Sequence, residues 1–136
     1  MTVQRPMNVF DIAGRAMSAQ LVRLNTTASN LANAGSVSTT EQGAFRALKP
    51  IFETVNGGEG VATVGVQRVV QSDVAPVKRH SPGHPLADAN GDVWEAGVDT
   101  SAELIDMVES ARQYQNNVQV LQTAKTLTLD TLRLGQ

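Results

Sequence analysis

The sequence predicts a mainly α-helical fold with a small β part. Its N- and C-terminal helices are expected to form a coiled-coil-like helical module around a central β-rich insert. Long stretches near both ends, residues 8–33 and 100–134, carry apolar side chains at helical spacing, whereas the stretch between them is rich in Gly, Pro and Val. We therefore expect residues 1–40 and 95–136 to form the helical assembly module, and residues 41–94 to form the insert domain.

The composition suits one small domain, or a helical module with one β module. The chain has 136 residues, of which 41% are hydrophobic and 18% are charged, and its net charge is −2. A nucleic-acid partner is not expected, because the chain has no basic excess. The absence of Cys excludes a thiolate metal site and a Cys nucleophile. No stretch approaches the ~20 apolar residues that a membrane span needs, and no apolar segment follows Arg5, so we expect neither membrane insertion nor a cleaved signal peptide.

The first predicted helix has a clear start and end. Asn8 is the expected N-cap, with Asp11 three residues later, and Gly35 is expected to stop the helix in a left-handed conformation. Two interleaved rows of mostly apolar residues recur every seven positions between them: Phe10, Met17, Leu24 and Leu31, and Gly14, Leu21 and Ala28. This spacing is typical of a coiled-coil seam, and its small residues would let a partner helix approach closely.

The last predicted helix has a capping box at its start. Thr100 can accept a hydrogen bond from the Glu103 amide while the Glu103 side chain reaches back. Lys125 and Arg133 lie toward the other end, where the helix dipole favours cations. Apolar residues then step by four and three along one side: Met107, Ala111, Tyr114, Val118 and Leu121.

The polar sides of both helices carry amides and hydroxyls in place of charges. Residues 24–40 and 113–124 contain no charged side chain. Such faces suit burial against other helices, since no ion has to be desolvated, although a weakly charged solvated face is the alternative interpretation. We expect the subunit interface to contain Met17, Leu21, Leu24, Ala28, Asn30, Leu31 and Asn33 of the first helix, and Met107, Ala111, Tyr114, Asn117, Val118 and Leu121 of the last.

The middle of the chain is expected to form strands and turns. Residues 45–54 are strand-like, residues 56–60 form a Gly-rich turn, and residues 61–71 carry the clearest strand pattern. A further extended piece is expected over residues 74–79. Residues 80–97 are turn-rich.

No pattern in the chain predicts a catalytic, cofactor or metal site. His80 and His84 have the spacing of two ligands on a helix, but Pro82 between them excludes that helix. Residues 88–92 resemble the opening of a calcium loop, yet Gly and Glu are missing from the later positions that such a loop requires, so we expect a β-turn. The chain is therefore expected to be no enzyme and to hold no cofactor or metal.

Several quoted stretches resemble one family of proteins. They are LNTTASNLANA at residues 24–34, YQNNVQVLQTAK at 114–125, TLRLGQ at 131–136, NVFDIAG at 8–14 and HPLADANG at 84–91. In combination they resemble the rod and hook family of axial proteins of the bacterial flagellum, and in particular its proximal-rod members. The likeness covers both ends of the chain and the approach to the last helix.

The resemblance implies a structural subunit of the proximal rod, the drive shaft that crosses the periplasm and transmits torque for motility. It implies type III export without a cleaved signal peptide and a place in the flagellar basal body. The implied partners are other copies, other rod proteins, the membrane (MS) ring and export apparatus at the rod base, and the surrounding P ring. Residues 92–94 (DVW) depart from the family pattern, which has an aromatic residue directly after Gly91, and residues 53–81 match no quoted motif.

A different class of function also fits two helices joined by an insert. This alternative is a monomeric helical-hairpin adaptor or export chaperone of the flagellar type III system. It predicts a stable, folded monomer, whereas the rod interpretation predicts frayed helix ends in the isolated chain. Circular dichroism combined with light scattering would distinguish the two.

Overall fold

The computed structural model describes residues 7–58 and 60–136, and it contains two terminal helices with a small antiparallel β region between them. This arrangement confirms the mixed fold that the sequence predicts, whereas the coiled-coil geometry of the helices stays a prediction. In chain order the elements are α1 (Val9–Asn33), β1 (Val37–Ser38), β2 (Leu48–Gly58), β3 (Val61–Gln71), β4 (Val77–His80), β5 (Asp92–Glu95) and α2 (Thr100–Leu134).

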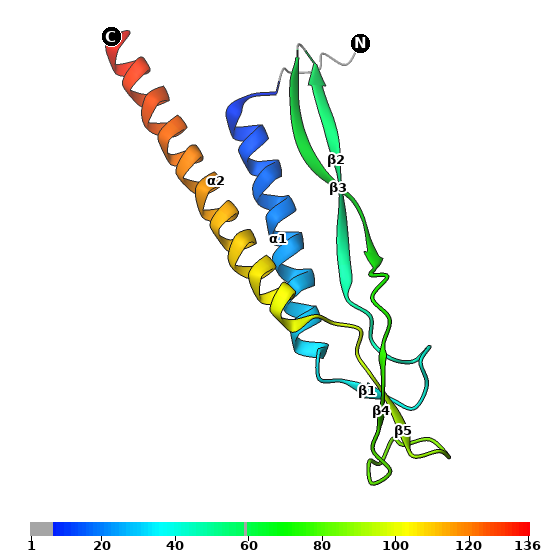
Figure 1. Cartoon of the computed structure of the whole chain (residues 1–136). Helices are drawn as coiled ribbons and strands as arrows, with labels where there is room; N and C mark the ends of the chain where they lie inside the picture. Colours follow the sequence, from blue (N-terminus) through cyan, green and yellow to red (C-terminus); the bar gives the residue numbers. More distant parts are fainter. Residues whose placement is uncertain (1–6, 59) are drawn as a thin grey trace.

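The molecule is long and narrow, with α1 lying between α2 and the β2–β3 hairpin (Figure 1). The start of α1 and the end of α2 lie at one end, and β1, β4 and β5 lie at the other (Figure 1). At 25 and 35 residues, the two helices are about 38 and 52 Å long. All α2 residues from Thr126 onward are exposed, and in Figure 1 this end diverges from α1.

The start of α1 agrees with the prediction, but its end does not. The Asn8 side chain accepts from the Asp11 amide, and the Asp11 carboxylate accepts from the Asn8 amide, which completes a capping box. The predicted left-handed stop at Gly35 is wrong, because the positive-φ glycines of the described chain are Gly58, Gly60 and Gly91. The Ser36 amide and hydroxyl instead satisfy the free Asn33 carbonyl at the end of the helix.

The predicted capping box at Thr100 and Glu103 is also wrong. Asp99 is the N-cap of α2, and its carboxylate accepts from the Ala102 amide at 3.1 Å. With the cap supplied one residue earlier, Glu103 is free to turn inward, where its side chain meets cationic and amide partners. The charge-assisted bond from Lys49 to the Glu103 carboxylate is stronger than the bond from the Thr100 amide to that carboxylate, which the sequence pattern suggested.

The longest β element is the β2–β3 hairpin. The predicted strand over residues 61–71 is confirmed as β3, whereas β2 begins later than predicted and continues through part of the predicted turn as far as Gly58. Pairing shifts from Ile51 with Arg68 to Phe52 with Val66, so that Gln67 is an extra, bulged residue on β3.

A small three-stranded sheet in the order β1–β5–β4 closes the opposite end. Strand β5 lies in the segment that the sequence predicted to be only turn-rich, because pairing with β1 and β4, rather than its own composition, makes it a strand. The predicted turn over residues 88–92 is confirmed: the Asp88 carboxylate accepts from the Asn90 and Asp92 amides, and Gly91 has φ +79°.

The hydrophobic core of the single chain is small. The buried hydrophobic residues are Ala13, Ala19, Ala44, Ala47, Val93 and Ala96. Large residues of the predicted heptad rows lie nearer the surface, with Phe10 40% and Leu21 44% exposed. Small side chains let backbones approach closely, but they bury little apolar area, so the isolated chain depends strongly on its polar contacts.

Candidate assembly interface

A group of polar side chains joins α1, α2 and the hairpin near the start of α2. We call it the polar joint; its members are Arg23, Asn30, Lys49, Glu103 and Asp106. Asn30 is fully buried, and its side-chain oxygen accepts from the Leu48 amide at 2.7 Å. Its Nδ2 donates to the Leu48 carbonyl at 2.9 Å and to the Glu103 carboxylate at 3.0 Å. Asn30 therefore acts as a strand partner for β2 and as a link to α2.

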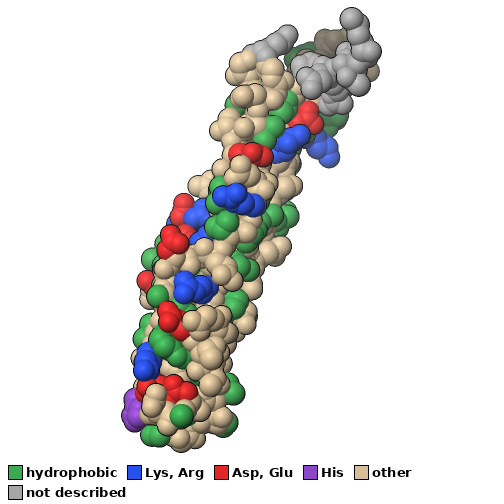
Figure 2. Space-filling model, turned by 90° about the vertical axis from the view of Figure 1, so that its right-hand side faces the viewer, with side chains coloured by type: hydrophobic (Ala, Val, Ile, Leu, Met, Phe, Trp, Pro, Cys, Tyr) green, Lys and Arg blue, Asp and Glu red, His purple; other side chains and the backbone are tan. Residues whose placement is uncertain are grey.

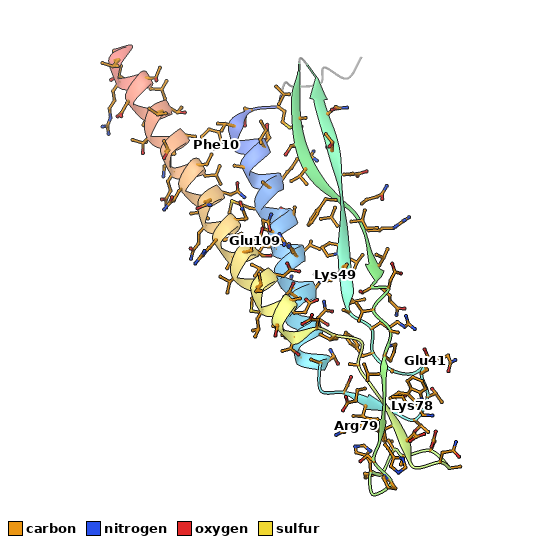
Figure 3. All side chains as sticks on the ribbon, in the orientation of Figure 1. Phe10, Glu41, Lys49, Lys78, Arg79 and Glu109 are labelled. Atoms are coloured by element: carbon orange, nitrogen blue, oxygen red, sulfur yellow. The ribbon has the colours of Figure 1, made fainter. Side chains whose placement is uncertain are left out.

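Ion pairs complete the polar joint. Glu103 is only 2% exposed, and its other carboxylate oxygen lies 2.6 Å from the Lys49 ammonium, which also contacts Asp106 at 3.3 Å. Arg23 of α1 reaches Asp106 at 3.0 Å and Glu109 at 3.5 Å. Figure 3 shows Lys49 at the base of the hairpin beside α1, and Glu109 between the two helices. A buried carboxylate is tolerable here because it is paired and hydrogen-bonded.

The pairing shifts two pKa values in opposite directions. Partial burial alone would lower the pKa of Lys49, but the hydrogen bond and charge of Glu103, followed by those of Asp106, raise it above its ordinary value. Partial burial would likewise raise the pKa of Asp106, but the hydrogen bonds and charges of Arg23 and Lys49 lower it. Both shifts favour the charged forms that hold the joint together.

The predicted interface residues of α1 lie in different environments. Asn30 lies wholly inside the chain, as part of the polar joint. Leu21 and Ala28 are exposed. The remaining predicted residues of this helix are half-buried: Met17, Leu24, Leu31 and Asn33. The structure thus gives Asn30 an internal role and leaves the others with surface that a partner can reach.

The predicted interface residues of α2 share one environment. All are half-buried, and they alternate with exposed neighbours at helical spacing: Met107, Ala111, Tyr114, Asn117, Val118 and Leu121. The fully buried Ser110 lies on the same side, and its hydroxyl donates to the Asp106 carbonyl. This side of α2 is therefore only partly covered by the chain itself.

Two exposed apolar surfaces on α2 were not in the predicted interface. Near the start of the helix, Leu104, Ile105 and Val108 border a shallow hollow, and Ile105 is 67% exposed. At the far end Leu127 and Leu134 are exposed, Leu134 by 88%. Apolar residues on two sides of one helix give a weak periodic pattern, which explains why a search for a single seam missed the first surface.

The described residues contain neither a candidate membrane span nor a candidate metal cluster. No helix among them combines the length and apolar character that crossing a bilayer requires. Their His, Asp and Glu side chains form no group able to hold a metal ion. His80 instead pairs with Asp92 at 2.8 Å on the small sheet.

Two family models match the two ends of the chain. Residues 10–37 match the model for the flagella basal body rod protein, and residues 89–134 match the C-terminal model of the flagellar basal body rod FlgEFG proteins. These ranges contain most of α1 and α2, the elements that carry the exposed surfaces.

Full-length relatives agree with the family models. The chain is 46% identical over 132 residues to flagellar basal-body rod protein FlgC of Escherichia coli O6:H1, covering 96% of this chain and 98% of that protein. It is 45% identical to FlgC of Salmonella typhimurium and 47% identical to FlgC of Yersinia enterocolitica, with the same shares covered. The chain belongs to the FlgC family of flagellar basal-body rod proteins.

Proposed function

We propose that this rod subunit polymerises through α1 and α2 with other copies and with other rod proteins, and so helps to build the proximal rod. The uncovered surface of α2 carries the proposal. The helix continues beyond its partner, every residue from Thr126 onward is exposed, and Leu127 and Leu134 lie on this projecting part. Exposed apolar side chains on a helix without a neighbour mark a surface that another protein can cover, because covering them removes apolar area from water.

The function is mechanical rather than catalytic. Torque passes along the rod through helix contacts, and the amide- and hydroxyl-rich sides of residues 24–40 and 113–124 allow many such contacts without desolvating charges. The subunit works in the periplasm as part of the drive shaft. It is exported by the flagellar type III apparatus.

Partners at the rod base and around the shaft follow from this role. We place the subunit in contact with the MS ring or export apparatus through neighbouring rod proteins, and the small sheet or hairpin in reach of the surrounding P ring. The monomeric adaptor or chaperone is the alternative. It is less well supported, because a self-sufficient monomer would bury larger side chains than the alanines found in this interior.

Electron microscopy of basal bodies tests the proposal. A strain lacking the protein is expected to form an intact membrane ring with no rod above it, and a copy of the gene should restore the rod. Intact rods in the deletion strain would refute the structural role.

A further inference from the structure

The two strands of the β2–β3 hairpin differ in how their outer edges are protected. On β2 the Leu48 amide and carbonyl both bond the Asn30 side chain, and Pro50, two residues further along the same edge, has no N–H. On β3, residues 61–66 (VATVGV) contain neither a charge nor a proline. Among residues 7–58 and 60–136, no backbone hydrogen bond outside the ladder reaches this stretch. Natural sheets seldom leave such an edge unprotected.

An open hollow of about 490 Å³ lies beside the same stretch of β3. Its described lining comes from α1 and β3 only, and three of the seven α1 residues in it are small: Gly14, Ser18 and Ala19. A Cβ added to Gly14 would meet nothing within 4 Å. Figure 2 shows the side of the molecule that lies on the right in Figure 1, where hydrophobic side chains are distributed along the length between charges of both signs. A strand added to β3 would lie over this hollow and place every second side chain into it.

We propose that β3 of one copy pairs with the outer edge of β2 of a second copy, so that the hairpins of adjacent subunits form one continuous antiparallel sheet. This inference rests on the proposed assembly of many copies, since a second copy is then always at hand. The distal half of β2, residues 52–56, lies beyond Pro50 and contains no proline. Main-chain pairing of this kind provides affinity, and the hollow provides specificity. The contact joins two different edges, so it continues from subunit to subunit.

Charge complementarity sets the register. Glu53 and Gly65 are opposite each other within the hairpin, and a Cβ on Gly65 would lie 3.8 Å from Glu53 Cγ, so both are on the same face of the sheet. Thr63, on this face too, donates to the Ile12 carbonyl, which identifies it as the face toward α1. With Glu53 of the second copy opposite Gly65, its carboxylate lies toward Arg15, which lines the hollow.

Within the described residues, neither charge has a competing ion-pair partner. Arg15 and Glu53 are exposed, and neither forms an ion pair with another residue of the described chain. Asp11, also on the hollow, is engaged in capping α1. Complementary charges at an interface fix register and exclude wrong partners.

Charge exchange tests the register in cells. Arg15→Glu alone and Glu53→Arg alone each place like charges together, and each should reduce the amount of the protein in isolated basal bodies about tenfold. The combined variant restores opposite charges between copies and should recover most of the lost incorporation. Singles that incorporate normally, or a double variant no better than the worse single, would overturn the proposed contact.

Cysteine cross-linking tests the strand pairing directly, because the native chain contains no Cys. Thr54 and Val64 share the proposed register, so we place Thr54→Cys in one copy and Val64→Cys in another and express both in one strain. Mild oxidation of isolated basal bodies should give a cross-linked dimer in the mixed strain and none with either variant alone. A cross-linked dimer in the strain that carries Val64→Cys alone would indicate a symmetric β3–β3 contact. Motile cells that form rods but give no cross-link between Thr54→Cys and Val64→Cys would indicate that the hairpins of adjacent copies do not touch. Both outcomes reject this inference and leave the rod function standing, whereas absence of the protein from basal bodies rejects the function.

Discussion

Replacing Asn30 by Ala removes the centre of the polar joint. The substitution deletes two hydrogen bonds to the Leu48 backbone and one to the Glu103 carboxylate. At about 1 kcal/mol of net stability per bond, with more for the charged partner, the expected loss is about 3–4 kcal/mol. A domain of this size has roughly 5–15 kcal/mol in total, so the loss is large. Urea unfolding followed by circular dichroism measures the free energy, and hydrogen exchange at the Leu48 amide measures the local opening.

Asn33→Ala is the matched control on the same helix. The Asn33 side chain donates to the Ser29 carbonyl within its own helix turn, so its loss should cost less than about 1 kcal/mol. Equal destabilisation by Asn30→Ala and Asn33→Ala would refute the claim that the joint links three elements. Unchanged exchange at the Leu48 amide in Asn30→Ala would refute the assignment of Asn30 as a strand partner.

Asn30→Asp gives the same test a pH dependence. The new carboxyl would lie buried beside Glu103, and both burial and like charge would raise its pKa above the unfolded value of about 3.9. The folded variant then binds a proton more readily than the unfolded chain, so its stability should fall as the pH rises through that raised pKa. Stability that is independent of pH above about 4 would contradict the buried location of residue 30 beside the Glu103 carboxyl group.

Three further predictions concern assembly and charge. Leu24→Asp should abolish rod incorporation and motility, because a carboxylate without a partner is placed against apolar neighbours at a cost of several kcal/mol; normal swimming of this variant would remove Leu24 from the interface. Removing residues 126–136 should change the unfolding free energy of the isolated chain by less than about 1 kcal/mol, because these residues are exposed. The same deletion should prevent assembly. Light scattering on the purified chain and blots of isolated basal bodies separate the two effects. The pKa of Asp106 is lowered in the folded chain, so the stability that Asp106 contributes is present above about pH 4 and is lost as the pH falls through its folded pKa. The pKa of Lys49 is raised in the folded chain, so the stability that Lys49 contributes is present below about pH 10.4 and is lost as the pH rises through its folded pKa. Urea titrations across pH should therefore show a plateau between these limits, and a maximum at either extreme would contradict the ion pairs.

Local patterns made part of this fold predictable. The Asn8 cap and the bounds of β3 depend on residues that are near neighbours in sequence, and both were predicted correctly. The inward turn of Glu103 was missed for the opposite reason. Its partners Asn30 and Lys49 are 73 and 54 residues away, and the nearby Thr100 offered a sufficient local explanation. Strand β5 was missed because pairing with β1 and β4, rather than its own composition, makes it a strand.

The candidate interface was predictable only in outline. On α2 the four–three spacing located one partly covered side, and the structure places all six predicted residues there. On α1 the helix is covered on two sides, by α2 and by the hairpin (Figure 1). A heptad rule assumes one partner, so it could not show that Asn30 is internal while Leu21 is exposed. Which of the surface residues meet a neighbouring subunit stays a prediction for the assembly experiments.

The location of the β4–β5 loop at the end opposite the start of α1 and the end of α2 has a practical consequence (Figure 1). A short epitope inserted at Gly83, which is exposed and where an added Cβ would meet nothing within 4 Å, would mark one pole of the subunit. An epitope fused after Gln136 would mark the other pole. Gold-conjugated antibodies against the two tags, imaged on isolated basal bodies, would then reveal which pole of each subunit points toward the cell and which toward the filament.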